Sequence, residues 1–184
     1  MRTNDTIIQE SKKWLESVVI EYNFCPFAKR ELQQGHVRFS VCRSNNMQDF
    51  LELLIQECEY LDTHSEIETT LLIGADAFSD FDDYLDMLGL AEILMSDQGY
   101  EGTYQLASFH PDYCFDGSDD QDAANYTNRS PYPMLHLLRE SSLEKALQHY
   151  DQPELIPENN VRNARTTGLE KFKSLLQGCY HDKE

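Results

Sequence analysis

The stretch VRFSVCRSNNMQDFLELLIQECEYLDTHSEIETTLLIG, residues 37–74, holds the pattern that decides the fold. Residues 37–41 alternate apolar and polar side chains as a half-buried strand does, and residues 69–74 form a compact β-rich run. Between them, residues 47–61 carry apolar side chains at helical spacing. A strand, a helix and a second strand in this order predict a parallel β-α-β crossover with its helix packed on the sheet.

The same two periodicities extend on both sides of this unit. A strand is predicted over residues 103–109 and an irregular polar loop over residues 116–132. Helices are predicted over residues 6–22, 27–32 after Pro26, 79–95 and 134–150, and the tail 152–184 is predicted to be irregular with one short helix at 169–176. The fold class is therefore α/β: one domain, residues 1–184, with a small, mostly parallel central sheet of about three or more strands flanked by helices.

The charge balance narrows the range of partners. The chain of 184 residues has 33 acidic and 15 basic side chains, which gives a formal charge of -18. Such a field repels phosphate backbones and anionic lipids, so neither nucleic acid nor a membrane is an expected partner. No apolar run reaches the roughly 20 residues that a bilayer-spanning helix needs, and the first residues are polar. We expect a cytoplasmic protein with its five scattered cysteines reduced, and the oligomeric state is left open.

A dense group of polar and titratable residues lies between residues 110 and 139. His110 follows the strand predicted at 103–109, at the carboxyl end where open α/β sheets bind ligands. Arg129 and Arg139 offer donors suited to a carboxylate or phosphate, and His110 and His136 titrate near neutral pH. In the helix predicted at 134–150, His136 shares one face with Arg139. The predicted substrate-binding residues are Arg129, Arg139, Asn125, Thr127, Asn128, Ser130 and Tyr132.

These residues predict an enzyme or ligand-binding protein that acts on a small anionic metabolite. Arg129 and Arg139 would hold the anion, while His110 and His136 would act as acid or base. A solvated loop that pairs its basic groups with the abundant carboxylates is the plainer interpretation of the same residues. The pattern indicates no particular cofactor.

A metal ion is a second interpretation of the same segment. Nitrogen and oxygen ligands follow one another closely at His110, Asp112, Asp116, Asp119, Asp120 and Asp122. The spacing does not fit the EF-hand loop, which needs Gly at its sixth position and Glu at its twelfth. A solvated acidic loop therefore explains these residues better, and no metal site is predicted.

Cys25 offers a third interpretation, a thiol-redox protein. Cys25 and Pro26 lie where a helix would begin, and a helix N-terminus lowers the pKa of a thiol. The local sequence resembles the active-site turn of glutaredoxins and omega-type glutathione transferases. Those families need a strand before the cysteine, for which residues 18–22 could serve, although their spacing favours a helix.

The segments 110–116, 125–140 and 23–28 together resemble a bacterial family of uncharacterised proteins, the domain of unknown function DUF1415. The run Asn-Arg-Ser-Pro-Tyr-Pro at 128–133, followed by His136, is its most distinctive part. The resemblance implies a bacterial single-domain protein and implies no catalytic residues. The main alternative to a small-molecule site is therefore a non-catalytic protein whose acidic surface docks a basic partner.

Overall fold

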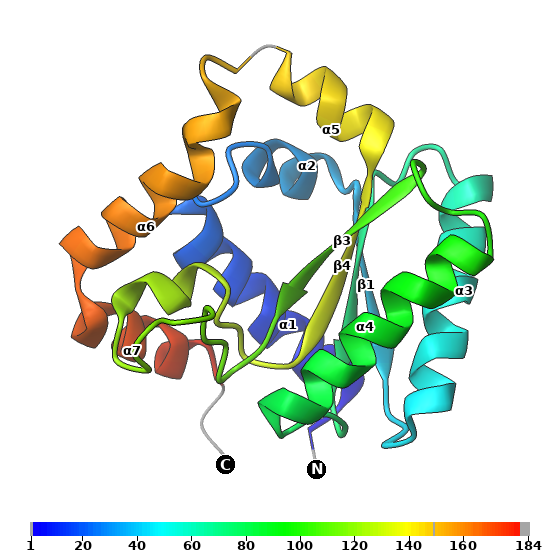
Figure 1. The fold of residues 1–184 in the computed structure, drawn as a ribbon, viewed down its shortest axis with the longest axis horizontal. Helices are drawn as coiled ribbons and strands as arrows, with labels where there is room; N and C mark the ends of the chain where they lie inside the picture. Colours follow the sequence, from blue (N-terminus) through cyan, green and yellow to red (C-terminus); the bar gives the residue numbers. More distant parts are fainter. Residues whose placement is uncertain (1, 149, 181–184) are drawn as a thin grey trace.

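Four strands and the helices between them make up most of the chain. The computed structural model describes residues 2–148 and 150–180 and is drawn as a ribbon in Figure 1. The strands are β1 (Val37–Cys42), β2 (Thr69–Gly74), β3 (Tyr104–Phe109) and β4 (Met134–Arg139). The helices are α1 (Asn4–Trp14), the π-helix η1 (Leu15–Ile20), α2 (Ala28–Gln34), α3 (Met47–Thr63), α4 (Phe81–Asp97), the 3-10 helix η2 (Ala123–Thr127), α5 (Glu140–Leu147), the 3-10 helix η3 (Pro153–Leu155), α6 (Ile156–Thr167) and α7 (Leu169–Cys179).

The sheet has the strand order β1-β2-β4-β3 and is mixed. The predicted crossover β1-α3-β2 is confirmed, because β1 and β2 pair in parallel. β4 lies between β2 and β3 and is antiparallel to both, so β2 and β3 run in the same direction without touching. The prediction of an α/β fold is confirmed, whereas the prediction of a mostly parallel sheet is wrong because it lacked β4.

The helix predicted at 134–150 is wrong over its first six residues, which form β4. Met134, Leu135, Leu137 and Leu138 form an apolar run that only His136 interrupts, and such a run does not distinguish a strand buried on both faces from a helix. The neighbouring strands decide the outcome, since β4 gains ladder hydrogen bonds on both edges. Only α5 remains of the predicted helix.

The N-terminal end of the chain is helical as predicted, and the C-terminal end is more helical than the sequence pattern suggested. The helix predicted at 6–22 is present as α1 and η1, whose last turns widen to π-type hydrogen bonds. The tail 152–184 is not irregular, because α6 and α7 occupy most of it; its residues 181–184 lie outside the described residues. Pro157 did not prevent a helix, because it lies in the first turn of α6, where a missing N–H costs nothing.

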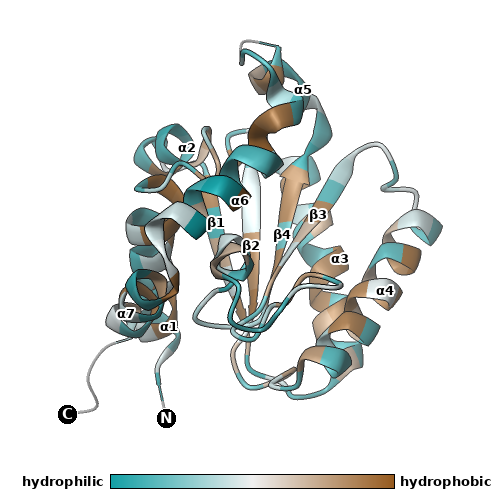
Figure 2. Ribbon diagram, turned by 60° about the vertical axis from the view of Figure 1, so that its left-hand side comes forward, coloured by the Kyte–Doolittle hydropathy of each residue, from teal (hydrophilic) through white to brown (hydrophobic). Residues whose placement is uncertain are grey.

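The helices form two layers, one on each face of the sheet (Figure 2). α3 and α4 cover one face, where Phe50, Leu54, Tyr84 and Met87 are fully buried. α1, η1 and α7 share the other core, which includes Trp14 and Phe172. Within the described ranges, no helix is both long and apolar enough to cross a bilayer.

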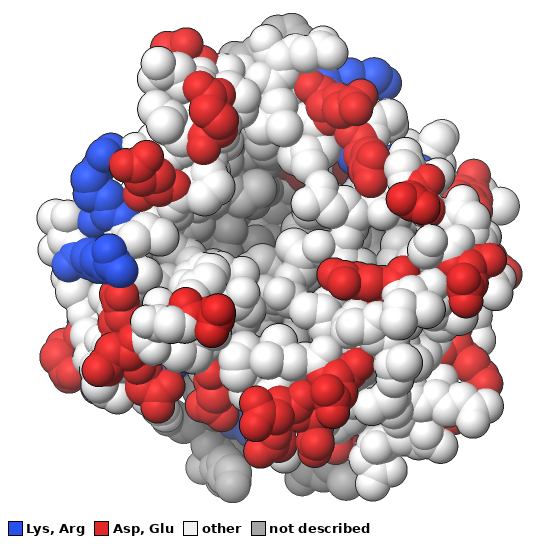
Figure 3. All heavy atoms as spheres, in the orientation of Figure 1, with Lys and Arg blue, Asp and Glu red and all other residues white. Residues whose placement is uncertain are grey.

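Part of the sheet face on the α1 side, over β3 and β4, keeps contact with solvent. Near the carboxyl end of β3, Trp14 packs edge-on against Phe109 with ring centroids 5.1 Å apart. α6 does not cover this part of the sheet, because it packs mainly on η2 and α7. Figure 3 shows the surface hollowed there, in the space that Figure 1 shows to be framed by α6, α5 and β3. We call this region the sheet hollow; the residues of β3 and β4 that face it and keep solvent exposure are Gln105, Ala107, His136 and Leu138.

Candidate functional site

His110 is a fully buried histidine with both ring nitrogens bonded. Its Nε2 donates to the carbonyl oxygen of Phe78 at 2.8 Å, and its Nδ1 accepts the backbone N–H of Asp112 at 3.0 Å. Burial lowers the pKa of His110 below its ordinary value. The ring also lies 5.1 Å from the rings of Phe81 and Tyr84. His110 therefore joins the chain after β3 to the chain before α4, and neither nitrogen remains for a substrate.

Arg129 uses its guanidinium group to hold its own loop together. Nε donates to the carbonyl oxygen of Tyr113 at 2.9 Å, and Nη2 donates to that of Asp120 at 3.2 Å. The guanidinium carbon lies 5.0 Å from the centroid of the Tyr126 ring. The carbonyl oxygen of Arg129 in turn accepts Nε1–H of Trp14 at 2.9 Å. The donors predicted to hold an anion are thus directed at main-chain carbonyls.

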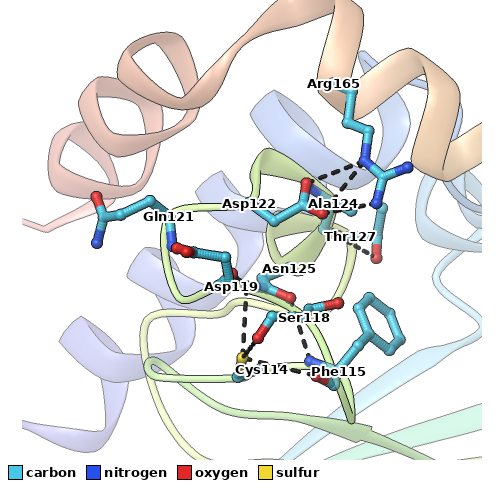
Figure 4. A network of polar contacts seen from close by, with 10 residues as sticks. All are labelled: Cys114, Phe115, Ser118, Asp119, Gln121, Asp122, Ala124, Asn125, Thr127 and Arg165. Atoms are coloured by element: carbon cyan, nitrogen blue, oxygen red, sulfur yellow. Dashed lines mark hydrogen bonds and ion pairs between the residues drawn. The ribbon is translucent and has the colours of Figure 1, made fainter.

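Asn125 lies at the centre of the polar loop and is fully buried (Figure 4). Its Oδ1 accepts the backbone N–H of Phe115 at 3.1 Å, and its Nδ2 donates to the carbonyl oxygen of Asp119 at 3.0 Å. Beside it, Asp122 caps η2 and pairs with Arg165 at 2.7 Å. The hydrogen bonds from Arg165 lower the pKa of Asp122. The loop is therefore braced internally and tied to α6.

The other predicted loop residues also bond within the protein. The hydroxyl of Thr127 donates to a carbonyl oxygen of η2 at 2.9 Å, and Asn128 Nδ2 donates to a carbonyl oxygen of β3 at 3.0 Å. Ser130, fully buried, donates to the carbonyl oxygen of Tyr132 at 2.6 Å. The hydroxyl of Tyr132 donates to the buried carboxylate of Glu10 on α1. These residues lie together along one connection, and each has a structural partner there.

Arg139 lies on the far side of the sheet from His136. The predicted helix placed the two on one face, whereas three residues of separation in β4 place them on opposite faces. Arg139 Nε donates to the carbonyl oxygen of Ile67 at 2.9 Å, and Nη2 donates to the carbonyls of Leu61 and His64. A cation that meets the last carbonyls of a helix is a favourable C-terminal cap. The guanidinium of Arg139 caps α3 rather than serving the sheet hollow.

His136 faces the sheet hollow in an orientation fixed by β2. Its Nε2 lies 2.5 Å from Thr69 Oγ1, and the same hydroxyl lies 2.5 Å from the carbonyl oxygen of Leu137. Because a carbonyl can only accept, the one hydroxyl proton of Thr69 goes to Leu137, and Nε2 must carry the proton of the other bond. The neutral imidazole is thus held with its lone pair on Nδ1. The sequence pattern missed Thr69, because its pairing with His136 follows only from the β2-β4 register.

The Nδ1 atom of His136 is open to the sheet hollow. Within residues 2–148 and 150–180, no hydrogen bond involves this atom, and the only buried side-chain nitrogen or oxygen without a partner is Thr70 Oγ1. Nδ1 is therefore in contact with solvent space. Burial of the ring lowers the pKa of His136 to about 4, so the imidazole is uncharged at neutral pH. Leu138 and Ala107, beside it on the same face, are half-buried and apolar.

Cys25 lies just before α2 and packs against the core on the α1 side of the sheet. The backbone N–H groups of Phe27 and Ala28 favour its thiolate, but burial outweighs them and raises the pKa of Cys25. The sequence had predicted a shift in the opposite direction. The chain before it is the π-helix η1, so the strand that a glutaredoxin-like turn requires is not there.

The acidic loop does not gather metal ligands. Among the described residues, no three His, Cys, Asp or Glu side chains are arranged to hold a metal ion. His110 is committed to Phe78 and Asp112, and Asp122 to Arg165. Asp119 accepts the backbone N–H of Gln121, so two of these carboxylates have a structural partner within or beside the loop.

A second concave region lies beside α6. It has a volume of about 420 Å³ and is lined by Tyr22, Asn23, Tyr150, Ile156, Asn159, Asn160, Arg162, Asn163 and Thr166. None of these side chains is a carboxylate, although the chain as a whole is strongly acidic. Arg162 donates one hydrogen bond, from Nη2 to Asn159 Oδ1 at 2.5 Å. The sequence feature that could have predicted this region is the spacing of its asparagines along one side of a helix. It was missed because the tail was predicted to be irregular.

The chain belongs to the family described as Protein of unknown function (DUF1415), which it matches over residues 6–174. The match covers the whole sheet, the polar loop and most of the C-terminal helices. Neither the curated proteins nor the solved structures gave a match to this chain.

Proposed function

We propose that this protein binds a small molecule in the sheet hollow, where the lone pair of His136 Nδ1 accepts a hydrogen bond from it. The observation that carries the proposal is the fixed, neutral imidazole with one unused acceptor on a partly exposed sheet face, between apolar Ala107 and Leu138 and near Gln105. Concave apolar sites with a few oriented polar groups are the usual form of ligand sites. The ligand therefore carries a hydroxyl or N–H group next to an apolar part.

The pKa of His136 decides between recognition and proton transfer. A general base works best when its pKa is near the operating pH, and at about 4 the imidazole of His136 is a weak base. It remains a good hydrogen-bond acceptor, because it stays neutral across the physiological range. We therefore assign it a role in recognition, and an enzymatic step would need a second group brought by the ligand or by a closing segment.

The proposal is tested by ligand-induced stabilisation with two variants of the hollow. Purified protein is screened by thermal unfolding against a set of small alcohols, amines, carboxylates and phosphates. A ligand at about one hundred times its Kd stabilises the fold by about 2.7 kcal/mol. Ala107→Trp fills the hollow beside His136, and His136→Gln removes the imidazole. Both should abolish the stabilisation, while Leu90→Gln on the exposed side of α4 should leave it intact.

A ligand that stabilises all three variants as it stabilises the wild-type protein would place its site elsewhere. The absence of any stabilising compound, together with a failure of the variant Ala107→Cys to react with a thiol reagent faster than the folded wild-type protein, would show the hollow to be closed. Either result overturns the proposal.

The hypothesis of an anionic ligand is supported better by the residues that line the concave region beside α6 than by Arg129 and Arg139. Arg162 supplies a cation, and tyrosine hydroxyls and the amide of Asn159 supply neutral donors, with no carboxylate among the lining side chains. The amides of Asn160 and Asn163 each also donate to a main-chain carbonyl, that of Phe24 and that of Tyr22. Titration with inorganic phosphate, followed by NMR of the side-chain amides of Asn159 and Asn163, tests this second candidate. Arg162→Gln should remove the shifts and Arg30→Gln, a charge change on α2, should not; equal shifts in both variants would reduce the effect to general ionic strength.

A further inference from the structure

The outer surface of α3 and α4 combines an apolar groove with a purely acidic surround. Met47, Leu51 and Ile55 of α3 and Leu94 of α4 line a groove of about 580 Å³. Within the described part of the chain, the large hydrophobic residues that are exposed are Leu85, Leu90 and Ile93, all on α4. Isolated exposed leucines are ordinary, but apolar side chains that continue a groove mark an interaction surface.

Helix geometry places two of these three residues beside the groove. Leu90 is one helical turn before Leu94 and so lies on the same side of α4. Ile93 borders the pair and is 60% exposed. Leu85 is nine positions before Leu94, which places it on the opposite side of the helix. Leu90 and Leu85 are similarly exposed, at 46% and 42%, although only Leu90 adjoins the groove.

The charge around the groove has one sign. α3 and α4 carry five carboxylates each and neither contains a lysine or arginine. Where α4 faces the viewer in Figure 3, carboxylates lie among uncharged atoms, while Lys and Arg gather over α6. Glu52 lies in the groove wall itself, and Asp86 and Asp97 lie along the exposed side of α4.

We infer that the α3–α4 groove docks an amphipathic helix of another protein whose apolar stripe is flanked by lysine or arginine. The apolar side chains fit the i, i+3, i+4 anchors of such a helix, and the carboxylates fit its basic flanks. A second copy of this chain is disfavoured, because two surfaces with nine exposed carboxylates each repel one another. An anionic membrane is disfavoured for the same reason. This surface lies on the opposite side of the sheet from the sheet hollow, so the inference does not depend on the proposed ligand.

A synthetic peptide tests the inference on the full-length protein. The probe is a labelled 18-residue helix with leucines at i, i+3, i+4 and i+7 and lysines on both flanks, and its counterpart carries glutamates in place of the lysines. Fluorescence anisotropy should show binding of the lysine peptide only, and the binding should weaken as salt rises from low to molar concentration. Leu90→Gln should weaken binding about tenfold, because one buried leucine is worth that factor. The matched control Leu85→Gln should change it less than twofold.

If Leu90→Gln and Leu85→Gln changed the affinity for the lysine peptide equally, the peptide would be binding to the acidic surface in general rather than to the groove. That result would overturn the inference. Equal binding of the lysine and glutamate peptides would show that charge does not determine binding, and would also overturn the inference. A concentration-dependent dimer in ultracentrifugation that Leu90→Gln dissociates would assign the groove to a second copy instead. Because Leu90 and Leu85 are both exposed, circular dichroism should confirm that both variants fold. Ala107→Trp should leave peptide binding unchanged, which separates this surface from the sheet hollow.

Discussion

The titration of His136 is the measurement on which the proposed ligand site depends most directly. A histidine in an unfolded chain takes up its proton near pH 6.5, whereas burial lowers the pKa of His136 in the folded protein to about 4. Between these two values the unfolded chain binds a proton that the folded protein does not. The free energy of unfolding therefore falls as pH falls from 6.5 to 4, and it is unaffected by this group above pH 7.

The magnitude follows from the difference between the two pKa values. At about 1.4 kcal/mol per unit, a fall from 6.5 to about 4 costs up to about 3 kcal/mol of stability at pH 4. The side chain keeps partial contact with solvent, so this is an upper bound. Urea unfolding of the wild-type protein and of His136→Gln at pH 7, 6, 5 and 4.5 isolates the contribution, because other groups titrate in both proteins. The wild-type protein should lose more stability than the variant over this range.

NMR of the imidazole nitrogens gives the same quantity without unfolding. Long-range proton–nitrogen correlation should show protonated Nε2 and bare Nδ1 at pH 7, as the bonds through Thr69 require. A midpoint near pH 6.5, or a proton on Nδ1, would refute the assigned orientation and with it the acceptor in the sheet hollow. Thr69→Val should shift the tautomer populations, because it removes the hydroxyl that fixes them.

Three further predictions concern residues that the sequence placed in a binding site. Arg139→Met should lower the free energy of unfolding by about 2–3 kcal/mol in urea melts, because it leaves carbonyls at the end of α3 without their cap, while Arg30→Gln should change it by less than about 0.5 kcal/mol. Asn125→Ala should cost about 1–2 kcal/mol in the same assay and expose the loop to trypsin, since it leaves a partly buried N–H of Phe115 and the carbonyl of Asp119 without their side-chain partner. Cys25 should react with iodoacetamide at pH 7.5 more slowly than in the urea-unfolded chain, because burial raises the pKa of its thiol; faster reaction in the folded protein would revive the redox interpretation.

The β-α-β unit could be predicted because its information is local. Residues 37–41 alternate as strands do, residues 69–74 cluster β-branched and apolar side chains in a way typical of buried strands, and residues 47–61 repeat at the helical period. β4 could not be predicted in this way, because Met134 to Leu138 are apolar on both faces and good helix formers. Its conformation is set by β2 and β3, which are distant in sequence, and the mixed sheet follows from that one strand.

For the candidate site, too, the sequence predicts what is local and misses what depends on strand pairing. His136 could be singled out as a titratable residue in the polar segment 110–139, but its orientation depends on Thr69, which is 67 positions away. Arg139 has the right chemistry for an anion, yet a strand in place of a helix turns it to the other face of the sheet. Residue type therefore identified the candidates, and only the register of β2 on β4 decided their roles.

The many polar residues between β3 and β4 have a structural explanation. Sequence patterns alone do not distinguish polar residues that support the backbone from those that form a binding or catalytic site. To insert β4 between β2 and β3, the chain must return along residues 110–133 in an irregular path that is partly buried. A buried irregular backbone has carbonyl and N–H groups with no ladder to satisfy them, and side chains with several donors or acceptors must do so instead. Asn125, Arg129 and His110 each bond two main-chain groups of this connection or its neighbours. His136 belongs to the strand rather than to the connection, and its Nδ1 is not required for support. A polar atom left over after the backbone has been satisfied is the one available to a ligand.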